Sequence, residues 1–314
     1  MLNRRQLRIK ALEGVYAFDK SLDKNIDFQI SYFLKSNKNF FKLYITCFSL
    51  LKELHYFANE LHSKNQKKYI NKDSDLSLNK FCNNLVLKRV SSNEFLSKKI
   101  NDFSVNYWES RSELISSIWN DIIESDISIK YLNDENNKSF ELDKLYLTNL
   151  FRKIIASNKK LYDFFEDTEI SWINDLPLVN SLVLSSIKNS KKSSKSLPLM
   201  MDIYKNDEDA EFGVKLLKSV IDNKDMLQDH ISKITLNWDN DRIAQIDLIL
   251  LQMCLAEFLF FKSIPVKASI NEYLEIAKEY SSKKSNIFIN GILDKLSKNL
   301  TKNGTLKKNK RGMQ

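Results

Sequence analysis

Apolar residues recur at helical spacing along most of the chain, and there is no convincing run of alternating strands. Over residues 4–18, for example, Leu7, Ala11, Gly14 and Phe18 fall on one face at about 100° per residue. This pattern predicts a first helix here. Because it is repeated through the sequence, it also predicts an all-α fold.

The middle of the chain is rich in Asn, Lys and Ser and carries the same helical periodicity. Its apolar segments are 40–61, 78–90, 104–129, 142–165 and 178–187. The composition shifts to Ser and Lys over 185–196, followed by a proline at 198, which is typical of a linker. We therefore expect a basic first helix at 1–20, a long helical extension or insertion at 21–190, a linker at 191–201, a helical domain at 202–301 and a basic tail at 302–314.

Further helices are predicted beyond the linker, at 207–221, 224–236, 242–261, from about 265 to 280, and 285–300. The segment 242–261 is so uniformly apolar that it should be the central buried helix. Ser285 is expected to cap the last helix. Gly291, inside that helix, is expected to mark close packing against a neighbour.

The composition excludes several classes of protein. Five glycines and three prolines are too few for a turn-rich barrel or a glycine-cradled phosphate loop. The three cysteines are odd in number and far apart, which fits a reducing cytosol and offers neither a disulfide frame nor a metal cluster. His55 and His62 are seven residues apart, but no third ligand lies near them. No nucleophile–base motif occurs, so the sequence predicts no cofactor, no metal and no enzymatic activity.

No segment predicts a membrane span. The first residues show no signal-peptide pattern. The longest apolar run, 243–261, is interrupted by Gln245, Asp247, Gln252 and Glu257, as expected for a buried helix. We expect a cytoplasmic protein that does not enter a membrane.

The formal net charge of +9 is concentrated at the two ends of the chain. Residues 1–10 hold four basic residues and no acid, residues 302–314 hold five and no acid, and 40 basic and 40 acidic residues lie between them. Lysine outnumbers arginine 41 to 8, as an AT-rich coding sequence alone could produce, yet three of the arginines fall within the first eight residues. Such localised charge indicates a polyanion, most simply a nucleic acid. A role for the C-terminal basic run stays open, because frayed basic tails are common.

The first predicted helix has a basic edge that ends in an aromatic residue. Eleven residues make about three helical turns, so Arg5 and Tyr16 lie nearly on one line, and Arg8 lies one turn beyond Arg5. Arginines at a helix start contact phosphates, and exposed aromatic rings stack on the bases of single-stranded RNA. Phe288 fits either base stacking or a place in the core.

Two carboxylates interrupt the apolar segment 242–261. Asp247 and Glu257 are ten residues apart and point to opposite sides of a helix, which excludes a catalytic pair. Glu257 is expected to be structural, accepting hydrogen bonds from backbone N–H groups at 263–267. Asp247 has no partner one turn away and faces either an internal cation or the surface.

An ordered series of motifs follows the linker: WDNDR at 238–242, AEFL at 256–259, IPVK at 264–267, INE at 270–272 with IAK at 276–278, and FINGILDK at 288–295. This series resembles the transcription antitermination factor NusB. The opening Arg4-Arg5-x-x-Arg8 with Ala11 and Tyr16 resembles the family's first helix, so the likeness covers about 1–20 and 202–300. WIND at 172–175 and DED at 207–209 resemble the extended NusB proteins of the Bacteroidetes group.

The resemblance implies an all-α fold of two packed helical bundles and a protein that is not an enzyme. It implies that, with NusE, a protein shared with the small ribosomal subunit, this factor binds boxA-type RNA of ribosomal RNA leader transcripts. It further implies action with RNA polymerase and other Nus factors to resist termination and aid rRNA maturation. The residues it implies are, for RNA, Arg4, Arg5, Arg8, Tyr16, Phe288 and Asn290, and, for the partner protein, Asp247 and Lys284.

Two other interpretations stay open. The sequence departs from the short-family pattern at Gln252, Lys284 and Ile287, where an Arg, an acid and a Lys are usual. A helical protein-docking or assembly factor without its own RNA recognition is therefore the main alternative. A NusB-type domain attached to an RNA-modifying enzyme is disfavoured, because the other residues contain no glycine-rich cofactor loop.

Overall fold

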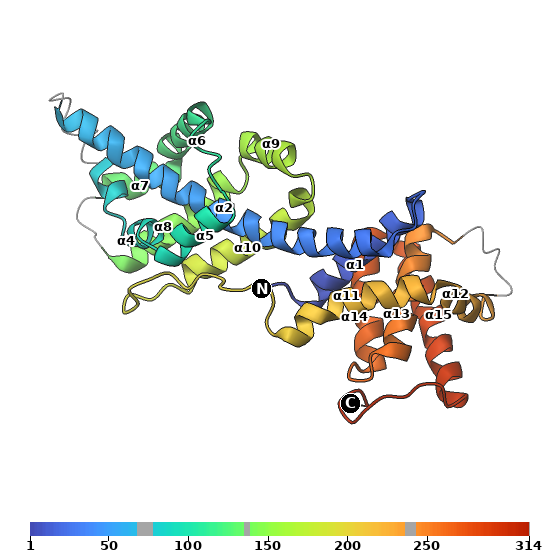
Figure 1. The fold of residues 1–314 in the computed structure, drawn as a ribbon. Helices are drawn as coiled ribbons and strands as arrows, with labels where there is room; N and C mark the ends of the chain where they lie inside the picture. The colour runs from blue at the N-terminus through green and yellow to red at the C-terminus, as the bar shows by residue number, and fades with distance from the viewer. Residues whose placement is uncertain (68–77, 135–138, 236–242, 314) are drawn as a thin grey trace. The chain divides into compact units, whose positions relative to one another are not determined.

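The computed structural model describes residues 1–67, 78–134, 139–235 and 243–313. Every regular element within these ranges is a helix, which confirms the predicted all-α fold (Figure 1). None of the helices in these ranges has the length and apolar character needed to cross a membrane. The WDNDR motif at 238–242 lies outside the described residues.

The chain forms two compact units. Unit 1 comprises Met1–Asn37 and Asp202–Gln314, and unit 2 comprises Lys38–Met201. Helix α2 (Ile26–Lys67) is continuous and contributes to both units. The division therefore falls at different positions from the expected 21–190 insertion and 191–201 linker. Within unit 1, the start of α2 packs against α11. The Phe33 ring of α2 lies so close to Gly213 that a Cβ atom on Gly213 would be 2.2 Å from the ring.

Unit 1 is built around one largely buried helix. Its elements besides the start of α2 are α1 (Arg4–Lys20), α11 (Asp207–Asp222), α12 (Lys224–Ser232), α13 (Gln245–Phe260), α14 (Val266–Tyr280) and α15 (Lys283–Lys302). Helix α13 contacts each of the other five, and residues 249–258 of it are all buried. A helix that is apolar all round must be covered on all sides, so the sequence pattern accounts for its central place.

Local sequence signals fix the first helix of unit 1. Asn3 caps α1 by accepting from the backbone N–H groups of Arg5 and Gln6, and the Gln6 side chain accepts in return from Asn3 N–H, which makes a capping box. Further along this helix, Gly14 allows α11 to approach, since a Cβ atom here would lie 3.1 Å from Leu217. The middle of α1 is therefore packed closely against α11.

Two expectations for the last helix were wrong. Ser282, rather than Ser285, is the N-cap of α15, and its hydroxyl accepts from the Ser285 backbone N–H. Gly291 does not mark close packing, because it is exposed and a Cβ atom there would meet nothing within 4 Å. Serines at both positions satisfy the same capping rule, and sequence alone does not choose between them.

Unit 2 consists of α2 from Lys38 onward, α4 (Leu85–Ser91), α5 (Glu94–Asp102), α6 (Ser112–Glu124), α7 (Asp126–Asn133), α8 (Phe140–Leu150), the π-helical turn η1 (Phe151–Ile155), α9 (Lys159–Thr168) and α10 (Trp172–Lys188). The expected apolar segments 104–129 and 142–165 are thus each divided among shorter helices. Residues 197, 199 and 200, in the expected linker, are buried, and the Met200 backbone N–H donates to the Tyr44 hydroxyl at 3.0 Å. This stretch is packed against unit 2.

Candidate nucleic-acid interface

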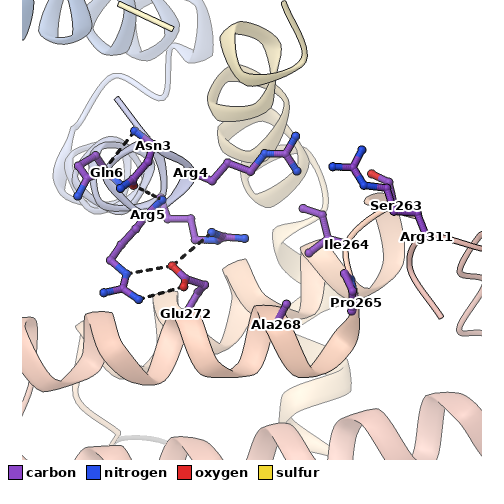
Figure 2. A pocket seen from close by; sticks show the side chains of 11 residues that line it. Asn3, Arg4, Arg5, Gln6, Ser263, Ile264, Pro265, Ala268, Glu272 and Arg311 are labelled. Atoms are coloured by element: carbon purple, nitrogen blue, oxygen red, sulfur yellow. Dashed lines mark hydrogen bonds and ion pairs between the residues drawn. The ribbon is translucent and has the colours of Figure 1, made fainter. Parts of the chain in front are cut away.

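The first turn of α1, the start of α14 and the C-terminal segment of unit 1 enclose a cleft with a volume of about 730 Å³ (Figure 2). Four arginines and a single acid contribute to its walls. The lining residues are Asn3, Arg4, Arg5, Gln6, Arg8, Ser263, Ile264, Pro265, Ala268, Glu272 and Arg311. We call this site the arginine cleft.

Arg5 forms a two-point ion pair at the edge of the arginine cleft. Its Nε and Nη2 atoms each donate to one oxygen of Glu272 at 3.0 Å. This hydrogen bonding lowers the pKa of Glu272 and raises the pKa of Arg5, so both groups stay charged. The Arg5 side chain remains 36% exposed, which leaves part of its guanidinium open to a ligand.

Arg4 and Arg311 share one carboxylate at the start of α11. Arg4 contacts Glu208 and Asp209, each at 2.8 Å, while the second oxygen of Glu208 lies 3.5 Å from Arg311. The hydrogen bond and charge of Arg4 lower the pKa of Glu208. Figure 2 shows the two guanidinium groups directed toward one another across the cleft.

Arg8 points into the protein instead of the solvent. The Arg8 side chain is 4% exposed, and its guanidinium donates to both oxygens of the fully buried Glu257 at 2.7 and 2.9 Å. Burial lowers the pKa of Arg8, but the charge and hydrogen bonds of Glu257 outweigh this effect and raise it above its usual value. A buried charge pair of this kind fixes the position of α1 against α13 and α14.

The Glu257 carboxylate is satisfied by side chains. Besides Arg8, the hydroxyls of Ser269 and Tyr273 on α14 donate to it at 2.7 and 2.8 Å. The sequence pointed to the same structural role but to backbone N–H groups as donors. Burial and the neighbouring negative charge of Glu257 raise the pKa of Tyr273 well above its usual value, so the ring keeps its proton.

The charges at the arginine cleft are balanced internally. The four arginines face four carboxylates: Glu208, Asp209, Glu257 and Glu272. An incoming phosphate must therefore compete with these acids. A phosphate reaches most easily the arginines with the most exposed side chains, Arg311 at 67% and Arg5 at 36%. It cannot reach the buried Arg8.

Tyr16 lies further along α1 and is exposed. Its ring is 38% accessible, and the Lys20 ammonium lies 5.6 Å from the ring centroid. With Arg5 three turns earlier, α1 presents the cation and the aromatic ring that the spacing predicted.

The remaining predicted site residues lie outside the arginine cleft. On α15, Asn290 and Lys284 are exposed and Phe288 is half-buried. Asp247 is buried at the start of α13 and accepts a hydrogen bond from Ser281. Gln252 is also buried, with its amide donating to Gln228 at 3.1 Å, so this departure from the family pattern lies inside the unit.

Sequence reasoning missed two contributors to the site, Glu208 and Arg311. In the sequence the acidic run 207–209 stood out as part of a family motif, and it also occupies the first turn of α11, where it suits the helix dipole. Arg311 belonged to a basic tail without an assigned role. The opposite charges of Glu208 and Arg311 were the only indication in the sequence that they meet. Charge alone does not predict a contact between residues about a hundred positions apart.

The described residues contain no group of three or more His, Cys, Asp or Glu side chains arranged to hold a metal ion. His55 contacts Ser91 and a backbone oxygen of Cys82, and His62 contacts Gln66. All three cysteines are buried and unbridged. The fold and the cleft thus define an all-α protein whose distinctive site is a set of positioned arginines.

Comparison with known proteins gives the family. The model described as "NusB family" matches residues 180–298. The chain is 40% identical over 112 residues to the transcription antitermination protein NusB of Chloroherpeton thalassium (36% of this chain, 53% of that protein). It is 37% identical over 117 residues to that of Clostridium tetani (37% and 74%), and 43% identical over 90 residues to that of Clostridium kluyveri (29% and 58%). The chain belongs to the NusB family.

The match leaves parts of each protein uncovered. The chain spans 53% and 58% of the length of two of these relatives. Helix α1 and residues 303–313 lie outside the range matched by the family model, as does most of unit 2. No solved structure gives a significant match.

Proposed function

We propose that this protein is an RNA-binding transcription antitermination factor that acts as an adaptor and not as an enzyme. The observation that carries the proposal is the arginine cleft, which places partly exposed arginines on the same helix as the exposed Tyr16. The name of the three relatives, transcription antitermination protein, supports it.

The proposed RNA is single-stranded and of boxA type, from ribosomal RNA leader transcripts. Arg4 and Arg5 contact its phosphates, and Tyr16 stacks on a base, with Lys20 beside the ring. Arg8 acts from inside by holding α1 in place. Phe288 and Asn290 on α15 extend the RNA surface.

The proposed protein partners are NusE, RNA polymerase and other Nus factors, in the cytoplasm. The exposed Lys284 lies on the side that meets NusE, and the buried Asp247 supports that side from inside through its hydrogen bond with Ser281. An adaptor that holds RNA and NusE together makes each raise the apparent affinity of the other.

A binding titration tests this function. Fluorescence anisotropy of a labelled boxA-type RNA is measured with wild-type protein, with and without NusE, at two salt concentrations. We expect binding that tightens with NusE and weakens steeply with salt, because phosphate contacts release counterions.

Two variants test the residues. Arg5→Gln should weaken binding and reduce the salt slope by about 0.7, the value for one phosphate contact on a single strand. Tyr16→Ala should weaken binding without changing the slope. Lys153→Gln, an exposed charge of unit 2, is the matched control. Unchanged affinity in both α1 variants would remove this helix from the site.

A protein-docking factor without RNA recognition is the second candidate. The internal balance of the cleft charges favours it, as does Ile287, which is 79% exposed on α15 beside Lys284. Capture of NusE without RNA binding at either salt concentration would establish this candidate and overturn the first.

A further inference from the structure

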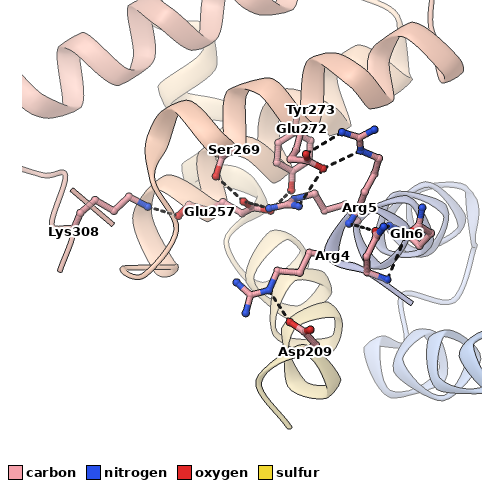
Figure 3. A network of polar contacts seen from close by, with 11 residues as sticks. Arg4, Arg5, Gln6, Asp209, Glu257, Ser269, Glu272, Tyr273 and Lys308 are labelled. Atoms are coloured by element: carbon pink, nitrogen blue, oxygen red, sulfur yellow. Dashed lines mark hydrogen bonds and ion pairs between the residues drawn. The ribbon is translucent and has the colours of Figure 1, made fainter. Parts of the chain in front are cut away.

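The C-terminal segment of unit 1, residues 303–313, is anchored to the end of α13. The Lys308 ammonium donates to the backbone oxygens of Glu257 and Phe261 at 3.0 and 2.8 Å (Figure 3). The Asn309 backbone N–H donates to Lys262 O at 3.0 Å. A cation at the final carbonyls of a helix is favourable, because these groups lack intrahelical partners and carry the negative end of the dipole.

Gly312 allows the closest approach in this segment. A Cβ atom at this position would lie 2.1 Å from the backbone oxygen of Lys262, which no side chain tolerates. The Gly312 N–H in turn donates to the Asn309 side chain at 3.0 Å. The contact of the C-terminal segment with the turn between α13 and α14 therefore requires glycine at position 312.

The contacts of Lys308 and Asn309 on one side and of Gly312 on the other hold Arg311 at the arginine cleft. Arg311 is the most exposed of the four guanidinium groups there. Arg311 forms a long ion pair of 3.5 Å with Glu208, whose other oxygen binds Arg4 at 2.8 Å. Two guanidinium groups directed at two oxygens of one acid reproduce the arrangement that a phosphate accepts.

We propose that Arg311 is a further RNA phosphate-binding residue, and that Lys308 and Gly312 are positioning residues which hold it at the arginine cleft. One phosphate takes the place of the half-exposed Glu208 carboxylate between Arg311 and Arg4. The proposal rests on the RNA-binding function above and adds an element beyond residue 298, where the family match ends.

The test uses the full chain and the same anisotropy titration, with a boxA-type RNA and an unrelated single-stranded RNA. Arg311→Gln should weaken binding of both RNAs roughly threefold to tenfold and reduce the salt slope by about 0.7, since a phosphate contact carries no sequence information. Lys310→Gln removes the same charge from an exposed neighbouring position and is the control.

Gly312→Ala separates position from charge. It changes no charge but cannot dock, so it should weaken binding about as much as Arg311→Gln. Lys308→Met should act in the same way. Combining either with Arg311→Gln should add little, because both changes act through one guanidinium. Circular dichroism and thermal unfolding verify that each variant is folded.

The outcomes separate this inference from the proposed function. RNA binding that falls with Arg5→Gln but not with Arg311→Gln or Gly312→Ala overturns the inference alone. Equal losses for Lys310→Gln and Arg311→Gln also overturn it, because they would show diffuse attraction. Absence of RNA binding by the wild-type protein overturns both.

Discussion

The interiors of the two units are stabilised by different kinds of interaction. At the centre of unit 1 an arginine and a glutamate, Arg8 and Glu257, form a buried ion pair surrounded by Ser269 and Tyr273. The centre of unit 2 is aromatic, with Trp119 edge-on to Phe81 at 4.9 Å between ring centroids.

Several buried polar groups of unit 2 form hydrogen bonds with uncharged partners. The Trp108 indole donates to Ser49 at 2.8 Å, the hydroxyls of Tyr44 and Ser186 lie 2.8 Å apart, and the Trp172 indole donates to the Asn39 backbone oxygen at 2.9 Å. Neutral hydrogen bonds cost less to bury than charges do.

The difference shows which helix of the chain is most tightly fixed in position. A buried ion pair adds little net stability when intact, yet it is strongly destabilising when one member is lost, and it allows only a narrow range of positions. In unit 1 that constraint falls on α1, the helix that carries Arg4, Arg5 and Tyr16. The unit 2 ion pairs Lys64–Glu60, Lys99–Asp102 and Lys144–Glu141 are all partly exposed.

The largest expected effect comes from breaking the central pair of unit 1. Arg8→Met should lower the free energy of unfolding by about 3–5 kcal/mol, because the fully buried Glu257 is left without its countercharge. Chemical denaturation measures this loss, with Arg152→Met, an exposed arginine of unit 2, as the control. Adding Glu257→Gln to Arg8→Met should recover part of the loss. Equal stability of Arg8→Met and Arg152→Met would contradict a structural role for Arg8.

A second variant should stabilise unit 1. Gly291→Ala places a methyl group where nothing lies within 4 Å, on an exposed interior turn of α15. We expect a gain of about 1 kcal/mol from the helix propensity of alanine, measured by the same denaturation. A loss of stability would mean that a close contact at Gly291 had been overlooked.

A smaller effect distinguishes the units by pH. Burial lowers the pKa of His55 in unit 2, so the folded ring stays neutral while the unfolded one takes up a proton below about pH 6.5. The stability contributed is present above that pH and declines below it. In unit 1 the hydrogen bond from Arg5 lowers the pKa of Glu272, whose contribution is present above about pH 4.5 and is lost as the pH falls through the lowered value.

Unfolding free energies of the wild type, His55→Gln and Glu272→Gln across this pH range test both assignments. His55→Gln should flatten the decline that begins near neutrality, and Glu272→Gln only the more acidic part. Parallel profiles for all three proteins would show that other groups set the acid sensitivity.

The smallest predicted effect concerns competition inside the arginine cleft. Glu208→Gln removes the carboxylate that occupies Arg4 and Arg311, so RNA affinity should rise about twofold to threefold, in line with the small strength of an exposed ion pair. Glu211→Gln, an exposed acid on the same helix, is the control for net charge. A fall in affinity would show that Glu208 organises the two arginines instead of competing for them.

Much of the fold could be predicted from periodicity and capping. The first residue of α1 and of α11 agreed with the sequence, as did the last residue of α14, because Asn3, Asn206 and the turn at 281–282 give local signals. Helix α2 was recognised only from residue 40, although it begins at Ile26. Its first turns carry apolar residues on several sides, with Phe28, Tyr32 and Leu34 exposed, so no single apolar face marks them as a helix. Their place in unit 1 depends on contacts with α11.

The site was less predictable than the fold. Arg5 and Arg8 lie one turn apart and look alike in sequence, yet one is at the edge of the cleft and the other is buried. The difference depends on Glu272 and Glu257, which α14 and α13 bring from more than 240 positions away. Spacing within a helix cannot contain that information.

The distance along the chain between α1 and its partners also determines the order in which parts of the protein can fold during synthesis. Arg5 meets Glu272 across 267 positions, with all of unit 2 between them. At about 5–20 residues per second, the ribosome takes on the order of 10–50 s to make that interval. Unit 2 is contiguous and can fold during this time, whereas the apolar face of α1 must wait. The proposed RNA surface of unit 1 is therefore completed late in synthesis.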